Sequence, residues 1–372
     1  MFENYEAPKE FIPNDPRFGS GPSKIPTDFV KSLLDTGHEL LGTSHRKPAV
    51  KNLVKEVQEG LRKYFELPDD YSVVLGNGGA TFLFDSIGLG LVEKKSVHFT
   101  CGEFSSKWYK SHHHIPWIEA ENIAVEFGSG ITPKDQADAD MVCCTLNETS
   151  TGVIIDSLPE VGENTILAVD ATSGGGQVPC DISKVDLFFF GPQKVFASEG
   201  GLYIAIMSPK ARARALKIAA DDSRYVPDIM NWKTAIDNSD KNQTYNTPSI
   251  TTFFYLNEQI KLMNKAGYKG VQEEANKRAE LIYGWAESKA YLSPFIQEKK
   301  YRSNAVATID VDEKIDVNPL IEKLAKTGAV FNIEGYRKLG RNQFRIAMFY
   351  NITFDDLEKL TKLLSHAIES EL

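Results

Sequence analysis

Short apolar runs that end in glycine, proline or polar residues recur through the first half of the chain. Runs of this length and closure indicate strands that are buried on both faces of a sheet. Stretches with apolar residues at helical spacing separate them, and strands that alternate with helices favour an α/β fold with a mainly parallel sheet. The predicted strands cover residues 71–75, 97–100, 123–127, 141–145, 166–169 and 185–190.

Apolar residues at helical spacing continue to the end of the chain, and the last hundred residues also contain two further predicted strands. Residues 305–311 and 343–348 alternate like strands, and the elements around them predict a separate α+β layer. We therefore predict a large domain of residues 17–260 and a small domain of residues 261–372, which also takes the N-terminal arm of residues 1–16. The predicted helices cover residues 26–36, 51–65, 82–91, 211–220, 250–265, 273–289, 319–327 and 354–371.

Composition argues against several classes of function. The 372-residue chain is 42% hydrophobic and 25% charged, and its net charge of −9 without a basic tract argues against binding nucleic acid or a membrane surface. No apolar run approaches the roughly eighteen residues of a membrane span, and the polar, acidic start of the chain is unlike a signal peptide. The four cysteines lack metal-type spacing, which suits small buried side chains in a reducing cytoplasm. The histidines at residues 112–114 are interpreted as a solvated loop, so no metal site is predicted.

One acid and one lysine follow two of the predicted strands. Asp170 ends the run at residues 166–169, and Lys194 follows the run at residues 185–190 through a glycine-proline turn. Ligands of open α/β sheets bind outside the carboxyl ends of the strands, so both side chains are expected over one crevice. A desolvated lysine has a lowered pKa and suits Schiff-base chemistry, and a carboxylate can hold the ring nitrogen of pyridoxal phosphate protonated. Without that chemistry, Asp170 would cap a turn and Lys194 would be solvated.

Three further segments near predicted strand ends offer contacts. The glycine-rich turn at residues 76–81, GNGGAT, precedes a helix and either cradles a phosphate on backbone N–H groups or serves as a plain turn. Phe104 either stacks on a flat ring or belongs to the core. Asn147 and Thr149 follow another strand, where a hydroxyl either reaches a ring substituent or caps a helix.

Arginines supply fixed positive charge in two regions of the chain. Arg46, which follows His45, and the pair Arg337 and Arg345 carry guanidinium forks that match carboxylate and phosphate groups. Surface salt bridges are the alternative for each of them. For Arg341 we keep the salt-bridge interpretation.

Several co-linear motifs together resemble the phosphoserine aminotransferases, class V members of the fold type I pyridoxal-phosphate enzymes. The resemblance implies a large cofactor-binding domain with a mainly parallel seven-stranded sheet, a small α+β domain and a homodimer. It implies amino transfer from L-glutamate to 3-phosphohydroxypyruvate, giving O-phospho-L-serine and 2-oxoglutarate, in cytoplasmic L-serine biosynthesis, with pyridoxine biosynthesis left open. The motifs are FGSGPSK, GTSHR, GNGGAT, GEFSSK, NETSTG, VDATSGG, GPQK, KNQTYNTPS and YRKLGRNQFRIAMF.

The same resemblance assigns roles toward pyridoxal 5'-phosphate. Lys194 would hold the cofactor as an internal aldimine and move the substrate proton, and Asp170 would pair with the ring nitrogen. Phe104 would stack on the ring, and Thr149 would form a hydrogen bond beside it. The cofactor phosphate would contact Ala80, Thr81 and Gln193.

Residues of a second subunit would complete the site in this resemblance. Asn246 and Thr247 would reach the cofactor phosphate across the dimer interface, and Arg46 with His45 would bind acidic groups of the substrate across the same interface. From the subunit's own chain, Arg345 is similar to the arginine that binds the α-carboxylate, and Arg337 to a contact of the substrate phosphate.

Three departures from the family pattern affect these expectations. Many members carry tryptophan where this chain has Phe104, and arginine where it has Thr81. Binding of the cofactor phosphate would then depend more on backbone N–H groups and on the partner's Asn246 and Thr247. The segment between Arg337 and Arg345 is also longer than in much of the family.

Two other functions fit a chain of this fold. A class V desulfurase or lyase would need a mobile catalytic cysteine in a loop. Cys143, Cys144 and Cys180 do not resemble such a residue, and Cys101 lies beside the expected stacking site rather than opposite it. A dimeric binding protein that keeps the fold without turnover would not need the pair Asp170 and Lys194.

Overall fold

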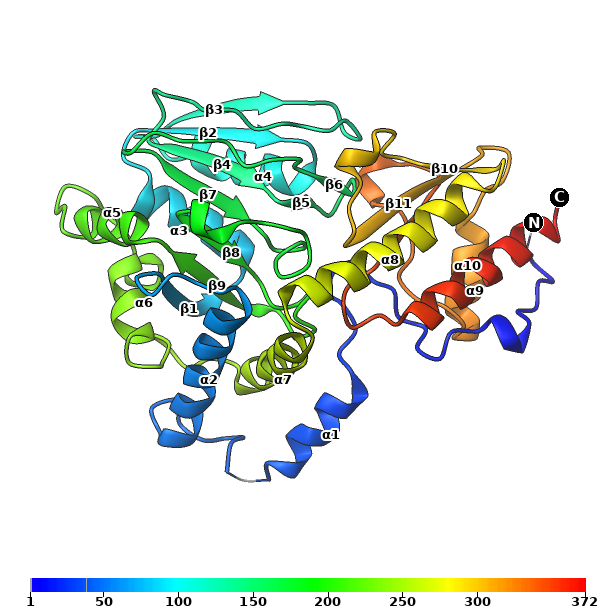
Figure 1. Ribbon diagram of the computed structural model, residues 1–372, viewed down its shortest axis with the longest axis horizontal. Coiled ribbons are helices and arrows are strands. Elements are labelled where there is room, and N and C mark those ends of the chain that lie inside the picture. The colour runs from blue at the N-terminus through cyan, green and yellow to red at the C-terminus, as the bar shows by residue number, and fades with distance from the viewer. Residues whose placement is uncertain (1, 38) are drawn as a thin grey trace.

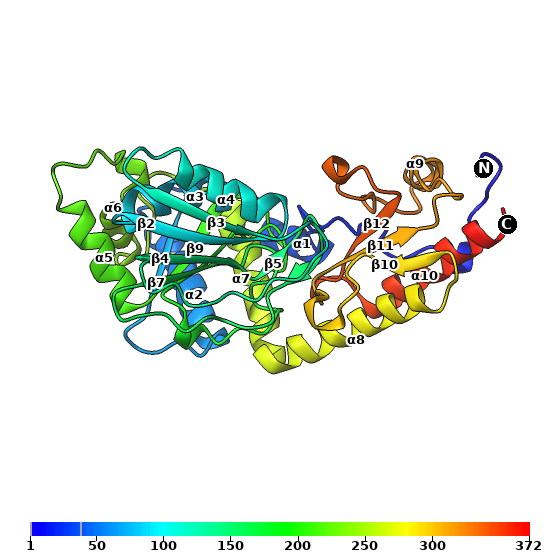
Figure 2. The ribbon, with the colours of Figure 1, turned by 90° about the horizontal axis from the view of Figure 1, so that it is seen from above.

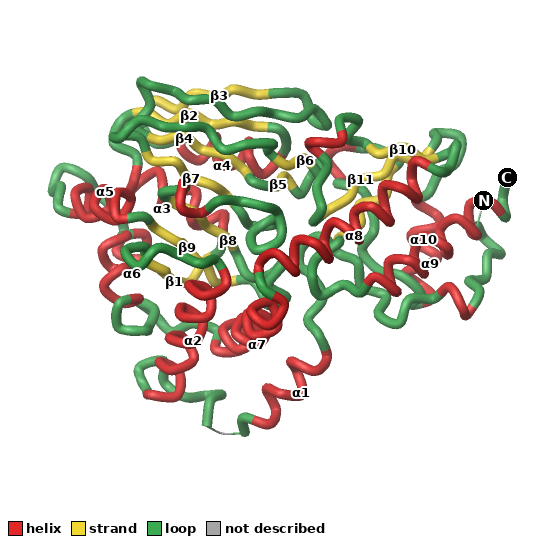
Figure 3. The backbone as a smooth tube through the Cα atoms, in the orientation of Figure 1, coloured by secondary structure: helices red, strands yellow, loops and turns green. Residues whose placement is uncertain are grey.

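The chain forms two parts joined by one long helix, as the computed structural model shows for residues 2–37 and 39–372 (Figure 1). Met1, the first residue of the predicted arm, lies outside the described residues. The larger part is built on a seven-stranded sheet and the smaller on a three-stranded sheet, both counted over the described ranges. Helix α8, Tyr268–Glu287, runs without a break from the larger part to the smaller one (Figure 3).

The large sheet has the strand order β1-β9-β8-β7-β4-β2-β3. The strands from β8 to β3 pair in parallel, while β9 pairs antiparallel with both of its neighbours. The predicted α/β fold with a mainly parallel seven-stranded sheet is therefore confirmed. The strands are β1 Ser72–Gly78, β2 Lys95–Thr100, β3 Glu119–Ala124, β4 Met141–Thr145, β7 Ile166–Asp170, β8 Leu187–Phe190 and β9 Gly201–Met207.

Side chains of the inner strands alternate between two apolar layers, which is why these strands read as continuous apolar runs. In β8, Leu187 and Phe189 belong to one layer, and Phe188 and Phe190 belong to the other. Helices α3 and α4 contribute to the first layer, and α2 and α7 to the second; Figure 2 shows α3 and α4 on the face opposite α2. Helices thus close both faces, as parallel sheets require.

Several helices begin at polar residues whose side chains accept hydrogen bonds from first-turn N–H groups. Ser208, Asn231, Ser249 and Thr353 do so for α5, α6, α7 and α10. Within the described ranges, no helix is both long enough and apolar enough to cross a membrane. The helices before α8 are α1 Thr27–Asp35, α2 Pro48–Tyr64, α3 Ala80–Leu91, α4 Glu103–His113, α5 Pro209–Ala219, α6 Trp232–Ser239 and α7 Ile250–Ala266.

The smaller part consists of an antiparallel sheet with helices packed on it. Its elements are β10 Leu292–Pro294, β11 Val306–Val311, β12 Gln343–Ala347, α9 Asn318–Thr327 and α10 Phe354–Glu369. The described part of the N-terminal arm lies against it, since Asn14 N donates to Asp356 Oδ1 at 2.7 Å. Phe18, just after the arm, accepts a hydrogen bond of 3.1 Å from Ala347 N of the same part. The boundary between residues 260 and 261 stays a prediction.

Shorter elements connect these parts. A two-stranded hairpin, β5 Asn147–Glu148 with β6 Val153–Ile154, follows the carboxyl end of β4. The 3-10 helices are η1 Lys9–Phe11, η2 Ile182–Lys184, η3 Asp228–Met230, η4 Lys299–Tyr301 and η5 Arg337–Leu339.

The structure differs from the sequence-based expectation at several elements. Strand β3 begins at Glu119 rather than at residue 123, because this edge strand is largely exposed and has no apolar run to mark it. The sequence pattern does not predict α4, α6 or β9. Helix α4 contains His112 and His113, two of the residues that the sequence predicts in a loop.

We expect close helix packing to make Gly60 intolerant of a side chain. A Cβ atom at Gly60 in α2 would lie 2.5 Å from Ile260 Cγ2 in α7. Overpacking of about 1–3 kcal/mol should outweigh the gain of about 1 kcal/mol from better helix propensity, so Gly60→Ala should lower the free energy of unfolding in urea.

The matched control for this variant is Gly284→Ala in α8. A Cβ atom there meets nothing within 4 Å, so this substitution should leave stability unchanged or raise it. Equal effects of the two substitutions would contradict the packing argument.

Candidate active site

Lys194 lies in the interior of the larger part, just beyond the carboxyl end of β8. Its residue is 6% exposed, and its Nζ donates a hydrogen bond of 2.7 Å to Thr149 Oγ1. The same Nζ lies 5.1 Å from the centroid of the Phe104 ring. The lysine is therefore buried with one hydroxyl partner, unlike the solvated side chain of the alternative interpretation.

Asp170 ends the neighbouring parallel strand β7, where it pairs with Phe189 of β8. It is 3% exposed, and it accepts hydrogen bonds from Thr172 N at 2.9 Å and from Thr172 Oγ1 at 2.5 Å. Because parallel strands end at the same edge of the sheet, Asp170 and Lys194 line one cavity.

Burial moves the pKa values of this pair toward each other. Desolvation lowers the pKa of Lys194 to about 8, against the opposing effect of the negative charges on Asp170 and Glu148. Desolvation also raises the pKa of Asp170, while the hydrogen bonds from Thr172 and the charge of Lys194 lower it. A lysine with a pKa near 8 has a sizeable neutral fraction at neutral pH, which nucleophilic and general-base chemistry both need.

The cavity around the pair has a volume of about 400 Å³, a size suited to a small organic ligand. Residues 20–22, which follow the N-terminal arm, and residues of the smaller part line it together with the strand ends. The predicted site residues that line it are Ala80, Thr81, Phe104, Thr149, Asp170, Gln193, Lys194 and Arg345. Lining residues without a predicted role include Ser20, Gly21, Pro22, Thr172, Ser173 and Tyr336, most of them within the motifs FGSGPSK and VDATSGG.

A glycine turn and the start of a helix form one end of the cavity. Gly78 and Gly79 have φ of 141° and 125°, values that a residue with a Cβ rarely adopts, and α3 begins directly after them. The first N–H groups of a helix have no carbonyl partner within the helix and favour an anion. This end of the cavity therefore suits a phosphate.

Arg345 on β12 brings positive charge to the cavity from the smaller part. Its guanidinium lies 5.4 Å from the centroid of the Tyr336 ring, and its buried Nε has no hydrogen-bond partner among the described residues. Burial lowers its pKa. A guanidinium fork in this state can bind a carboxylate.

Two other arginines lie away from the cavity. Arg337, in η5, lines a neighbouring depression together with Arg341, and is absent from the lining of the main cavity. Arg341 forms hydrogen bonds of 3.0 and 2.7 Å with the two carboxylate oxygens of Asp310, in agreement with the salt bridge expected for it. The substrate contact expected of Arg337 stays a prediction.

The residues expected to act across a dimer interface gather outside their own chain's cavity. Thr247 Oγ1 lies 3.2 Å from His45 Nδ1, and Asn77 Nδ2 donates to the backbone oxygens of Asn246 at 3.2 Å and Thr247 at 3.1 Å. Arg46 is exposed beside them. The structure thus brings these residues together, although His45 and Thr247 are 202 positions apart, but it does not bring them to Lys194 of the same chain.

The residues that line the cavity fit pyridoxal phosphate. Four of them carry buried polar atoms without a hydrogen-bond partner among the described residues, and these atoms are free to meet a polar ligand. The cavity also offers an amine, an acid, an aromatic ring and a helix start, which match the aldehyde, ring nitrogen, ring face and phosphate of that cofactor. The unpartnered atoms are Ser20 Oγ, Asn147 Oδ1, Gln193 Oε1 and Arg345 Nε.

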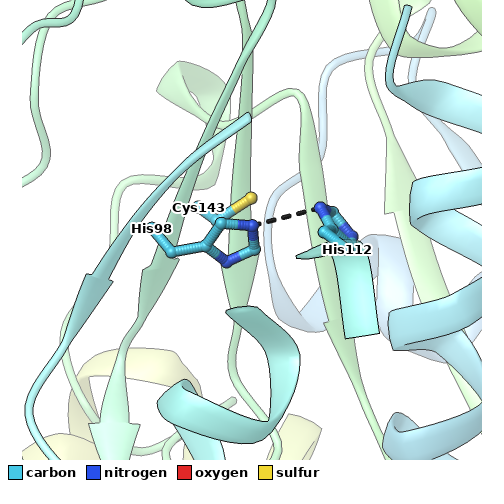
Figure 4. A group of neighbouring side chains, drawn as sticks. All are labelled: His98, His112 and Cys143. Atoms are coloured by element: carbon cyan, nitrogen blue, oxygen red, sulfur yellow. Dashed lines mark hydrogen bonds between the residues drawn. The ribbon is translucent and has the colours of Figure 1, made fainter. Parts of the chain in front are cut away.

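The interpretation of residues 112–114 as a solvated loop is wrong for His112. This residue lies in α4, is 0% exposed, and contacts His98 of β2, with His112 Nδ1 3.1 Å from His98 Nε2 (Figure 4). Cys143 of β4 completes a group of three side chains whose possible metal-ligating atoms lie within 4.8 Å of one another. Only one of the three histidines at residues 112–114 is buried, and a run of three identical residues gives no signal of which one it is.

Hydrogen bonds already use three of the four ring nitrogens in this group. Trp108 Nε1 can only donate, and it lies 3.1 Å from His112 Nε2, so that nitrogen accepts and Nδ1 carries the proton of the neutral ring. His112 Nδ1 then donates toward His98 Nε2 or toward Ser96 Oγ, which lies 3.1 Å from both of these nitrogens. Ligating histidines usually donate their second N–H to an acceptor, but His98 Nδ1 has no partner among the described residues. The geometry favours a neutral polar cluster in the core.

Comparisons with known proteins agree with the fold and show the family of the chain. The family Aminotransferase class-V matches residues 113–337. A phosphoserine aminotransferase of Corynebacterium glutamicum is 44% identical over 97% of this chain and 96% of its own length. A phosphoserine aminotransferase structure from Cytophaga hutchinsonii superposes with a TM-score of 0.85, 25% identity and coverage of 95% of this chain and 99% of that one.

One further structure was solved with the cofactor in place. It is a pyridoxal-phosphate-bound phosphoserine aminotransferase from Trichomonas vaginalis, with a TM-score of 0.79 and 18% identity, covering 95% of this chain and 100% of that one. At this identity the likeness concerns the fold.

The sheet, the cavity and the family match make the chain a class V aminotransferase. Within that class it belongs to the phosphoserine aminotransferase family, because relatives of that name share more than two fifths of its residues over almost its entire length. The family and enzyme class expected from the motifs are confirmed.

We expect the buried histidine cluster to make folding stability depend on pH. Burial lowers the pKa of His112 to about 3, and that of His98 well below its usual value. The unfolded chain therefore binds protons that the folded chain does not, so stability is full above about pH 6.5 and falls as the pH drops toward the folded pKa. Between pH 7 and 5 each of the two histidines should lower the free energy of unfolding by about 2 kcal/mol, and urea unfolding measures this change.

Two substitutions in α4 separate this effect from general acid lability. His112→Gln should lower stability at pH 7 but reduce the loss between pH 7 and 5 by about 2 kcal/mol. His113→Gln, at an exposed position in the same helix, should leave that loss unchanged. The same pH dependence in wild type and His112→Gln would contradict the assignment.

Proposed function

We propose that the chain catalyses the reversible transfer of the amino group of L-glutamate to 3-phosphohydroxypyruvate, giving O-phospho-L-serine and 2-oxoglutarate, with pyridoxal 5'-phosphate as cofactor. Relatives named phosphoserine aminotransferase, up to 44% identical over 97% of the chain, support this proposal. The structural observation that carries it is the buried amino group of Lys194 in one cavity with Asp170 and Arg345. The reaction belongs to L-serine biosynthesis, and pyridoxine biosynthesis is left open as a second use.

Lys194 has two tasks in the proposed reaction. When bound, pyridoxal phosphate supplies an electron sink that lets a proton leave the carbon next to the amino group. Lys194 would hold the cofactor through Nζ, and once released the same atom would take this proton and return it as general base and acid. A pKa of about 8 suits both directions of proton transfer near neutral pH.

Asp170, Phe104 and Thr149 would hold the ring. The Asp170 carboxylate, desolvated and oriented by Thr172, would keep a proton on the ring nitrogen by charge. Phe104 would pack against the ring face, and Thr149 would donate its hydroxyl proton beside Lys194. The cofactor phosphate would bind at the start of α3, beside Ala80, Thr81 and Gln193. Because Thr81 is neutral where many members have arginine, the backbone N–H groups of this helix start would carry more of the binding.

The substrates are anionic, and the proposal assigns their charges to arginines. Arg345 lines the cavity and would bind the α-carboxylate through its fork. Arg337 would bind the substrate phosphate from the neighbouring depression. His45 and Arg46 would add positive charge from a second subunit. A local cluster of this kind can attract anions despite a net charge of −9.

A homodimer would complete the site. His45, Arg46, Asn246 and Thr247 form one group that does not reach its own chain's cavity, so a two-fold partner is the natural recipient. Large hydrophobic side chains are exposed close to these residues in sequence: Leu41 is 40% exposed before His45, and Tyr245 is 42% exposed beside Asn246. An apolar surface next to unused polar groups fits an interface between two copies.

The cysteines support the proposed chemistry and the proposed cytoplasmic location. All four are free thiols, which suits a reducing compartment. Burial raises the pKa of the Cys101 thiol well above its ordinary value, and Cys143 and Cys144 are buried in β4. A desulfurase would need a mobile, ionisable thiol, so the residues of this chain favour amino transfer.

The direct test is an assay of amino transfer from L-glutamate to 3-phosphohydroxypyruvate, with 2-oxoglutarate as the measured product. Wild type should turn over, and Lys194→Ala should lose activity by several orders of magnitude. Borohydride reduction followed by mass spectrometry should attach the cofactor to Lys194 in wild type and to no residue in the variant. An adduct on another lysine would refute the assignment.

The shared site predicts complementation between two inactive chains. Lys194→Ala and Arg46→Ala subunits, refolded together, should form mixed dimers in which one of the two sites has both residues intact. Half of the dimers are mixed at equal ratio, so about a quarter of wild-type activity should return.

The control mixes Lys194→Ala with Asp170→Asn, two changes in the same chain's cavity. No mixed dimer then contains an intact site, and activity should stay at the level of the separate variants. If the Arg46→Ala mixture behaves like this control in samples that contain heterodimer, Arg46 does not serve the partner's site.

A further inference from the structure

The start of helix α4 has no cap of its own. The residue before the helix is Gly102, which has no side chain to accept hydrogen bonds from the first turn. Ser105 Oγ meets the backbone N–H groups of Cys101 and Gly102 at 3.1 and 3.2 Å. The N–H groups of Phe104 and Ser105 need a partner from elsewhere in the chain.

The carboxylate of Glu148 supplies that partner from hairpin strand β5. Its Oε1 accepts from Phe104 N at 3.3 Å, and its Oε2 accepts from Ser105 N and Ser105 Oγ, both at 2.9 Å. A negative charge at the start of a helix is also favoured by the helix dipole. Glu148 thus caps a helix that begins 45 positions before it.

The same carboxylate also fixes the turn that follows it. Glu148 Oε1 accepts from Ser150 N at 3.1 Å and from Ser150 Oγ at 2.7 Å, while Ser150 Oγ accepts from Glu103 N at 3.0 Å. Glu148 is 0% exposed, so these contacts replace water entirely. A buried carboxylate with five hydrogen bonds from protein groups is held in one position.

Gly102 makes this arrangement sterically possible. A Cβ atom at Gly102 would lie 2.3 Å from Glu148 Cγ and 2.6 Å from Ser150 Oγ. The glycine is therefore explained by the approach of the carboxylate, since its φ of 176° is open to any residue. The backbone before α4 and the Glu148 side chain fit only together.

Both segments that Glu148 fixes lead directly into the cavity. Phe104, in the first turn of α4, has its ring on one side of Lys194 Nζ, and Thr149 is the residue next to Glu148 and the hydrogen-bond partner of that Nζ. The charge of Glu148 favours the protonated forms of both Lys194 and Asp170.

We propose that Glu148 is a positioning residue of the cofactor site: its buried carboxylate ties the first turn of α4 to residues 149–150, and so fixes Phe104 and Thr149 around Lys194. The proposal rests on the proposed function, because it assigns Phe104 and Thr149 to the ring of pyridoxal phosphate. Glu148 itself is absent from the cavity lining and acts through these neighbours.

The test uses two substitutions that remove different properties of Glu148. Glu148→Gln keeps the length of the side chain but removes its charge and turns an NH₂ group toward N–H donors. Glu148→Asp keeps the charge but is one methylene too short to reach both segments. Glu103→Gln is the matched control, since Glu103 lies in the same turn and pairs with Lys338 and Lys107 at the surface.

The first readout is made on the cofactor-free protein. Acetylation of Lys194 as a function of pH, followed by mass spectrometry, reports the pKa of its amine. Glu148→Gln should lower that pKa, because a nearby negative charge favours the protonated amine. Glu148→Asp and Glu103→Gln should leave it near the wild-type value.

The second readout is the affinity for pyridoxal phosphate, measured by fluorescence titration. Both Glu148 variants should bind the cofactor at least about tenfold more weakly, a loss equivalent to about 1.4 kcal/mol, while Glu103→Gln should bind as wild type does. Wild-type affinity together with a wild-type Lys194 titration in folded Glu148→Gln would overturn the proposal. Failure of wild type itself to bind the cofactor would instead refute the proposed function.

A milder variant covers the case in which Glu148→Gln does not fold. Ser150→Ala removes one hydrogen bond to the carboxylate and one to Glu103 N, and leaves the charge in place. It should weaken cofactor binding a few-fold without moving the Lys194 titration. Unchanged affinity in this variant would then count against the positioning role.

Discussion

Burial of the Lys194 amine is the constraint on which the rest of the site depends. A cationic amine inside a sheet protein costs free energy unless opposite charges and hydrogen bonds surround it. Thr149 accepts its hydrogen bond, and the carboxylates of Asp170 and Glu148 favour its charge, while burial and Arg345 oppose it. The balance leaves a pKa of about 8, so the amine can gain or lose a proton at little cost near neutral pH.

The topology of the large sheet brings these groups to one edge. Strands β7 and β8 are parallel, so Asp170 and the turn to Lys194 leave the sheet side by side. Strand β9 runs in the opposite direction, and its first residue, Gly201, pairs with Gly78 at the end of β1. Both glycines line the cavity, so the reversal at β9 brings the glycine turn before α3 to the same place as the lysine.

The sequence predicts those parts of the site that a local pattern of residues marks. The apolar runs before Asp170 and Lys194 are visible because strands buried on both faces need no polar stripe, and the glycine turn at residues 76–81 is visible because its backbone requires glycine. Helix α4 is not predicted, because its cap is the Glu148 carboxylate from a distant segment. The prediction for His112 is wrong for a related reason, since its buried neighbours His98 and Cys143 lie far from α4 in the sequence, on strands β2 and β4.

The segment from residue 147 to residue 152 shows why such tertiary contacts matter more here than any single element. Within it Thr149 meets Lys194, Glu148 caps α4, and the backbone oxygen of Thr151 accepts a hydrogen bond of 2.6 Å from Thr308 in the smaller part. The cavity walls from both parts are therefore connected through one short hairpin. Since Arg345 pairs with Thr308 across β11 and β12, the position of Arg345 relative to Lys194 depends on that hairpin as well.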